Sequence, residues 1–170
     1  WTPGAYEISN FARWVTNFAA TQAAGAAGVA ARALDWERAD YDTWRVRPAA
    51  AKGAVTVRFD YLADTLDNAM AWSRPDFAFF NGTNVFPYAE GRGFDFPATV
   101  SIHAEPGWLV ATGMTPAPPA PSASAQRDRA ADPTPRTFQA SSYHDLVDMP
   151  FFVGVFDFDS VRVAVPPTAG

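Results

Sequence analysis

The sequence predicts an all-β fold, mostly an antiparallel sandwich or saddle-like sheet, with one or two short helices. Hydrophobic residues make up 48% of the 170 residues and aromatic residues 15%, and aromatic types favour strands. Several short runs alternate apolar and polar side chains, which is the period of a strand with one buried face. Only 18% of the residues are charged, so the chain is too apolar for disorder, and its length suits a single domain over residues 1–170.

The N-terminal part leaves two alternatives open. Apolar residues of segment 10–18 recur at helical spacing: Phe11, Trp14, Val15 and Phe18. The same segment is rich in Trp, Val, Thr and Phe, which favour strands, so both a helix and a strand fit it. The small residues of segment 19–33 likewise fit either two strands joined by a turn or a weak helix.

Strand signals become clear after residue 35. The run Trp44–Arg47 is extended, and the alternation of residues 54–61 places four apolar side chains on one buried face: Val55, Val57, Phe59 and Tyr61. Residues 98–104 alternate in the same way, and a Glu-Pro-Gly turn leads from them into residues 108–112. We therefore predict a hairpin over residues 98–112.

The remaining segments predict further strands, a helix and a loop. Residues 77–88 indicate a buried aromatic strand, an Asn-Gly turn and a returning strand, and residues 151–165 predict further strands. A short helix over residues 143–148 has Ser141 or Ser142 as its N-cap and stops before Pro150. Residues 115–136 are rich in proline and alanine without any periodicity, which predicts a flexible loop.

Composition excludes several classes of partner. The net charge is −5 and the 13 Lys and Arg residues are scattered, so we expect no nucleic-acid partner. No apolar run approaches the roughly 18 residues that span a bilayer, so we expect no membrane partner. The absence of cysteine excludes disulfides, thiol catalysis and cysteine-based zinc sites, and it fits both the cytosol and a Gram-negative periplasm.

Histidine chemistry is equally limited. The two histidines are His103 and His144, and neither begins the H-E-x-x-H motif that places two zinc ligands on one helix face. His144 and Asp145 point about 100° apart on a helix, so they cannot form a triad with Ser142. We expect His103 to be a solvated strand residue and His144 a surface residue, with no catalytic residue and no metal ligand in this chain.

Three blocks of sequence resemble one family of enzymes. The first is Trp-Thr-Pro-Gly-Ala-Tyr-Glu-Ile-Ser-Asn-Phe-Ala-Arg at residues 1–13, a Pro-Gly corner between aromatic residues, and the others cover residues 77–88 and 138–154. Their order and spacing resemble the N-terminal domain of the glycyl aminopeptidase family, bacterial zinc metallopeptidases that carry a PDZ domain. Four residues depart from the family pattern: Ala5 and Met149 replace Ser, His144 replaces Asp, and Phe152 replaces Glu.

The resemblance implies a supporting role in a larger enzyme. It implies a non-catalytic β domain, truncated at both ends, whose catalytic and PDZ domains belong to the same polypeptide and whose parent acts on peptides. Zinc is expected in that catalytic domain, where it would activate water with a glutamate as general base. The cellular location is left open, with the bacterial periplasm favoured over the cytoplasm.

The resemblance also singles out candidate site residues. By analogy with zinc aminopeptidases, the tip formed by Asn81, Gly82 and Thr83, with Tyr88 behind it, is a candidate wall of the substrate cleft. The alternative is that this segment is a hairpin that only contributes to the core. Tyr143 and Asp148 are candidates for a hydrogen-bonded latch to the following domain, and the alternative is that Asp148 is a solvated acid. Phe152 would remove a glutamate that orients the neighbouring domain or the substrate.

A second function remains open. An aromatic-rich β-sandwich that stands alone would bind a carbohydrate or a peptide on an exposed sheet face. Trp36, Trp44 and Trp72 are the candidate platforms, and solvent exposure separates such platforms from core tryptophans.

Overall fold

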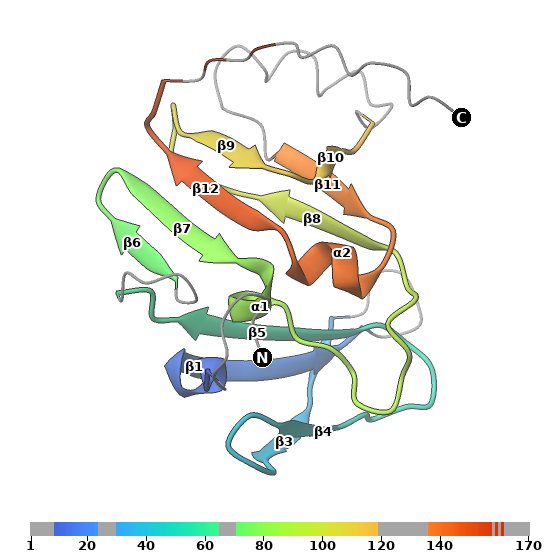
Figure 1. Cartoon of the computed structure of the whole chain (residues 1–170). Helices are drawn as coiled ribbons and strands as arrows, with labels where there is room; N and C mark the ends of the chain where they lie inside the picture. Colours follow the sequence, from blue (N-terminus) through green and yellow to red (C-terminus); the bar gives the residue numbers. More distant parts are fainter. Residues whose placement is uncertain are drawn as a thin grey trace.

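The computed structural model describes residues 9–23, 30–64, 71–118, 136–157, 159 and 161, and these form an all-β structure (Figure 1). All paired strands are antiparallel, and they form three sheets and a two-stranded hairpin. The only α-helices in these segments are the short α1 (Gly82–Val85) and α2 (Tyr143–Val147). The predicted fold class is therefore confirmed. None of the described helices has the length and apolarity that crossing a membrane requires.

Two sheets form a sandwich. The four-stranded sheet has the order β6 (Trp72–Arg74), β7 (Phe77–Asn81), β12 (Pro150–Gly154) and β9 (Leu109–Thr112). The C-terminal three-stranded sheet has the order β10 (Thr115–Pro116), β11 (Arg136–Ala140) and β8 (Ala98–Ile102). Side chains from both sheets meet in one hydrophobic core, which identifies the two layers as a packed sandwich.

Phe151 lies at the centre of this core. Its side chain is fully buried, stacks on Phe80 with a ring-centroid distance of 4.9 Å and meets the edge of Phe86 at 6.0 Å. Phe138 and Val100, from the opposite sheet, belong to the same cluster. Burying large aromatic side chains from both layers supplies most of the apolar area that stabilises such a sandwich.

The N-terminal strands form separate sheets. After one turn of 3₁₀-helix, η1 (Phe11–Trp14), the N-terminal three-stranded sheet has the order β2 (Arg32–Ala33), β1 (Val15–Gln22) and β5 (Val55–Tyr61). A hairpin of β3 (Asp35–Arg38) and β4 (Trp44–Arg47) accompanies it. In Figure 1 these elements lie at the end of the sandwich next to α1.

The structure favours strands in both N-terminal segments for which the sequence left a helix and strands open. Segment 10–18 is a helical turn followed by a strand, because the β-branched residues from Val15 onward fit a pleated surface better than a helix. Thr21 pairs with Ala33, so segment 19–33 begins and ends in paired strands. Residues 24–29, which join them, lie outside the described residues.

The hairpin predicted over residues 98–112 is wrong. Its turn is present, since the Trp108 amide donates to the Glu105 carbonyl at 3.1 Å and Gly107 has a φ of 82°. However, β8 pairs with β11 and β9 pairs with β12, so the two strands belong to opposite layers. Each strand finds its partner where its inward side chains reach the common core, and that burial outweighs local pairing across the turn.

The burial predicted for the start of β5 is also wrong. Val55 and Val57 are 44% and 37% exposed, although Phe59 and Tyr61 are half-buried as expected. Only the second half of β5 is therefore covered on the face that the alternation predicted to be buried.

The Asn-Gly turn and returning strand predicted within residues 77–88 are replaced by a helix. β7 runs directly into α1, and the Asn84 side-chain oxygen accepts a hydrogen bond of 2.8 Å from the Asn81 amide. This asparagine side chain satisfies an amide at the helix start, which favours a helical turn over a hairpin.

The C-terminal expectations are met only in part. The helix predicted over residues 143–148 is confirmed as α2, and β12 accounts for the first strand of the tail. The loop expected over residues 115–136 begins with the paired strand β10, which corrects its N-terminal end. Residues 119–135 and 162–170 lie outside the described residues.

Candidate functional site

The predicted cleft residues lie where α1 meets α2. The Gly82 amide donates to the Met149 carbonyl at 3.0 Å, and Asn81 pairs with Pro150. Gly82 is buried, and a Cβ there would lie 2.3 Å from the Leu146 carbonyl oxygen. Only glycine allows this approach of the two backbones, so Gly82 holds α1 against the end of α2.

The other two cleft candidates differ in exposure. Thr83 is half-buried, and its hydroxyl has no hydrogen-bond partner among the described residues. Tyr88 is 56% exposed, and its ring contacts Phe94 and Tyr143 with centroid distances of 5.2 and 5.6 Å. Tyr88 is therefore the candidate whose side chain is most open to a ligand.

Helix α2 is fixed by its cap. The Ser142 hydroxyl accepts from the Asp145 amide at 3.1 Å, and the Ser141 hydroxyl donates to the Asp145 carboxylate. The hydrogen bond from Ser141, followed by that from Ser142, lowers the pKa of Asp145. The sequence left both serines open as the N-cap, and the structure assigns the cap to Ser142.

The two domain-contact candidates have different surroundings. Tyr143 is buried and its hydroxyl donates to the Phe86 carbonyl at 2.6 Å, so that donor is used inside the domain. Loss of solvation raises the pKa of Tyr143 to about 12, with a smaller contribution from Tyr88. Asp148 is exposed at the end of α2, and its carboxylate has no partner within the described segments.

The structure brings all six predicted residues to one region. Asn81, Gly82 and Thr83 form the start of α1, which contacts the end of α2 through Gly82. The Tyr88 ring contacts Tyr143 of α2, and Asp148 is the C-cap of α2. These residues come from segments more than 50 positions apart, yet they share one helix as their support. Their roles in a cleft and in a domain contact stay predictions.

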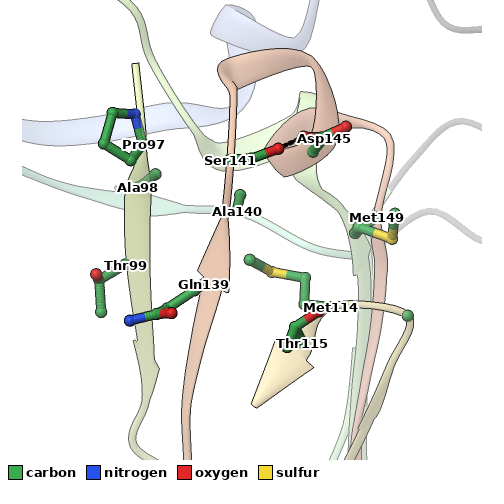
Figure 2. Close-up of a pocket in the computed structure, with 11 residues that line it drawn as sticks. Pro97, Ala98, Thr99, Met114, Thr115, Gln139, Ala140, Ser141, Asp145 and Met149 are labelled. Atoms are coloured by element: carbon green, nitrogen blue, oxygen red, sulfur yellow. Dashed lines mark hydrogen bonds between the residues drawn. The ribbon is translucent and has the colours of Figure 1, made fainter. Parts of the chain in front are cut away.

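A hollow that the sequence did not indicate lies beside this region (Figure 2). It has a volume of about 540 Å³ and is lined by β8, β11, the turn after β9 and the start of α2. Figure 2 shows its polar side chains: Thr99, Thr115, Gln139, Ser141 and Asp145. Met114 and Met149 supply apolar lining.

The lining of the hollow offers hydrogen-bonding groups beside apolar surface. Its lining holds one carboxylate, Asp145, which is already hydrogen-bonded to Ser141, and no histidine or lysine. A proton-transfer pair needs two such groups within reach of one substrate. Sequence patterns missed the hollow because its lining comes from three separate stretches of the chain, residues 97–99, 113–115 and 139–149, with no motif.

The histidines occupy the surface positions that we expected. His103 is exposed just after β8, and His144 is exposed on α2, edge-on to Phe94 at 5.1 Å. Across residues 9–23, 30–64, 71–118 and 136–157, no three His, Cys, Asp or Glu side chains are grouped so that they could hold a metal ion.

The candidate tryptophan platforms fall into two groups. Trp36 is 41% exposed and meets the edge of Phe18 at 5.0 Å, while Trp44 stacks on the same ring at 5.2 Å. Trp72 lies on the four-stranded sheet, half-buried, and contacts Phe77 at 4.8 Å. Of the three, only Trp36 is exposed as a platform would be.

The sandwich, with its capped helix and the hollow beside it, defines an all-β domain. Comparison with known families then identifies it: the chain belongs to the family described as the peptidase M61 N-terminal domain, whose model matches residues 1–155. This confirms the resemblance to the N-terminal domain of a peptidase family that the three sequence blocks indicated.

A solved structure supports the same assignment. The crystal structure of an aminopeptidase N family protein from Idiomarina loihiensis is similar, with a TM-score of 0.69 and 27% sequence identity. The match covers 91% of this chain but 23% of that protein, so the chain spans less than a quarter of its relative's length. A search of curated proteins gives no significant match.

Proposed function

We propose that this domain is the non-catalytic part of a zinc-dependent, aminopeptidase-like metallopeptidase, where it shapes the substrate cleft and supports the catalytic domain. The match to the peptidase M61 N-terminal domain carries this proposal. It is supported by a relative in which the same fold occupies 23% of a longer chain.

The proposal assigns the metal chemistry to the rest of the polypeptide. This sequence contains no H-E-x-x-H motif, and its two histidines, His103 and His144, are far apart in the sequence, so it lacks the helical pair of zinc ligands that this motif supplies. Bound in the catalytic domain, zinc would activate the attacking water. The partners of the domain are then the catalytic and PDZ domains of the same polypeptide, and the peptide substrate reaches it through the parent enzyme.

The region around α2 is the part of the domain that we assign to the cleft. Tyr88 offers an exposed aromatic ring that contacts Tyr143 of α2, and the Gly82 amide of α1 donates to the Met149 carbonyl just after α2. Asp148 offers an exposed carboxylate for a contact with the next domain. A rigid sandwich behind these groups holds them in place, which a cleft wall requires.

A zinc-dependent assay tests the proposed function. The 170-residue chain is incubated with zinc and aminoacyl p-nitroanilides, in parallel with the longer polypeptide that carries this domain. We expect hydrolysis by the longer polypeptide alone, lost on chelation and restored by zinc. Hydrolysis by the 170-residue chain, or zinc-independent hydrolysis by the longer one, would contradict the proposal.

The cleft assignment is tested at Tyr88. In the longer polypeptide, Tyr88→Ala should lower kcat/KM for peptides about 3- to 10-fold, because one aromatic contact contributes roughly 0.5–1.5 kcal/mol. Tyr41→Ala is the matched control, since Tyr41 is 54% exposed and lies in the turn between β3 and β4. Equal kinetics for the two variants would remove Tyr88 from the cleft.

The alternative function, a binding module for carbohydrate or peptide, rests on the exposure of Trp36. A sugar ring stacked on Trp36 would change its fluorescence. Titration of the domain with oligosaccharides would support this function by a saturable shift that Trp36→Ala abolishes, and a flat titration would exclude it for the sugars used.

A further inference from the structure

The outer face of the four-stranded sheet is aromatic. Because neighbouring residues of a strand point to opposite sides, Phe80 and Phe151 face the core while Phe77, Phe79 and Phe152 face outward. Trp72 pairs with Phe79, and Arg74 lies 4.5 Å above the Trp72 ring. We call this surface the aromatic face; its rings are Trp72, Phe77, Phe79, Phe152 and Phe156.

The rings of the aromatic face contact one another in a continuous row. Phe77 stacks on Phe152 at 5.3 Å and meets the edge of Trp72 at 4.8 Å. Phe152 also contacts Phe79 at 6.4 Å and Phe156 at 5.2 Å. Phe152 remains 36% exposed in the centre of the row.

The opposite side of the sandwich shows what an uncovered face of this protein looks like. The outward positions of the C-terminal three-stranded sheet are Thr99, Ser101, Thr137 and Gln139. Ser101 and Thr137 hydrogen-bond to each other at 3.2 Å in the open. One outer face is therefore polar and the other aromatic, and a sheet that is apolar on both faces is typical of one that is covered on both.

The course of the chain indicates what covers it. β12 lies inside the sheet, between β7 and β9, and the chain that leaves it passes over the aromatic face, since Phe156 packs on Phe152. The same face ends at Asn81, one of the predicted cleft residues, which pairs with Pro150. The aromatic face is thus continuous with the candidate site and with residues 155–156, through which the chain leaves β12.

We infer that the aromatic face is the docking surface for an apolar surface of the catalytic domain that follows in the same polypeptide. This inference rests on the proposed function, since it names the contact through which the domain supports its partner. Because both surfaces would belong to one polypeptide, their effective concentration is high, so a modest apolar contact centred on Phe152 suffices to hold them together. Phe152, where the family pattern has Glu, suits such a contact.

A single thiol tests the docking surface without any activity measurement. The chain contains no cysteine, so Phe152→Cys places one reactive group at the centre of the aromatic face. Val57→Cys on β5 is the matched control, because Val57 is 37% exposed and Phe152 36%. Maleimide labelling of each position is followed by peptide mass spectrometry in the 170-residue chain and in the longer polypeptide.

We expect labelling at position 152 to be at least about tenfold slower in the longer polypeptide and labelling at position 57 to be unchanged, because reaction at a docked surface requires the interface to open. Equal rates at position 152 in both chains would overturn the inference. Protection of position 152 that depends on protein concentration would also overturn it, since the occupant would then be a second copy.

A second variant separates docking from folding. Phe152→Glu removes the ring contacts of Phe152 and adds a charge, so the loss of Tm that it causes is first measured in the 170-residue chain. The longer polypeptide should lose no more Tm than that, but it should become more sensitive to proteolysis between its domains. Unchanged proteolysis of the longer polypeptide would overturn the inference. Because neither readout uses hydrolysis, the docking surface can fail while the zinc-dependent activity of the proposed function stands.

Discussion

Position 82 has no room for a side chain larger than that of glycine. A Cβ at this position would lie 2.3 Å from the Leu146 carbonyl oxygen and 2.7 Å from the Val147 Cα, and both are backbone atoms of α2. Backbone atoms cannot move aside as a flexible side chain does. The contact therefore decides whether α1 and α2 can meet at all.

Gly82→Ala should lower the free energy of unfolding by about 1–3 kcal/mol, the usual cost of forcing a methyl group into a packed site. Urea denaturation followed by tryptophan fluorescence measures it. Gly93→Ala is the control, since a Cβ at Gly93 meets no atom within 4 Å, and it should change stability by less than about 0.5 kcal/mol. Similar losses for the two variants would show that the close contact is not the cause.

Tyr143 makes the stability depend on alkaline pH. Burial raises its folded-state pKa to about 12 from an ordinary value of 10.0, so the folded state favours the neutral phenol. The stabilisation is fully present below pH 10 and is lost as the pH rises through 12. Burial also raises the pKa of Tyr61 to about 12, so Tyr61 adds to the loss of stability at alkaline pH.

Tyr143→Phe removes one of these two contributions. At pH 7 the variant should be less stable by about 1 kcal/mol, because the hydrogen bond to the Phe86 carbonyl is lost. Between pH 10 and 12 its stability should fall less steeply than that of the wild type, while the trend from Tyr61 persists in both. Parallel curves of unfolding free energy against pH would show that Tyr143 does not titrate with folding.

At the scale of elements, α2 depends on its cap. A five-residue helix has little stability of its own, so the hydrogen bond from the Asp145 amide to Ser142 and the burial of Leu146 must hold it in place. Ser142→Ala should cost about 1 kcal/mol. Ser101→Ala removes a hydroxyl from an exposed strand position and should cost less than about 0.5 kcal/mol. Thermal melts compare them; equal shifts would contradict a capping role.

The elements also mark the limit of what the sequence predicts. Local signals located β4, β5, β7, β8, β9 and α2 correctly, because alternation, turn residues and caps act within a few positions. Local signals predicted the wrong pairing partners for β8 and β9. The pairing depends on core residues from distant segments, such as Phe138 of β11 and Phe151 of β12. The continuous apolar run of β7 likewise hid which of its rings face outward.

The sequence likewise indicated some residues of the candidate site but not how they meet. Matched blocks drew attention to Asn81, Gly82 and Tyr143, but only the structure shows that they meet at α1 and α2. The Gly82 contact is with the backbone of α2, more than 60 positions away, and no residue pattern encodes it. The hollow of Figure 2 and the aromatic face each take residues from several strands, so no single segment of the sequence reveals them.

At the scale of the whole molecule, α1 joins the two halves. It lies against η1, which leads into the N-terminal three-stranded sheet, and against α2, which leads into β12 of the sandwich. A backbone hydrogen bond reinforces this connection, since the Ser73 amide of β6 donates to the Ala63 carbonyl, just after β5, at 2.8 Å. Two halves that share such a junction should unfold as one cooperative unit.

Gly82→Ala tests that cooperativity, because its clash lies inside the junction. Hydrogen exchange should speed up by the same factor for the β1–β5 amides and for the β7–β12 amides, since both would exchange through the same global opening. Trp36→Ala provides the contrast: Trp36 packs on Phe18 at the edge of the N-terminal half, so opening local to β3 and β4 should dominate there. Faster exchange in only one half of the Gly82→Ala variant would show that the two halves open independently. In that case α1 would contact both halves but would not make their unfolding cooperative.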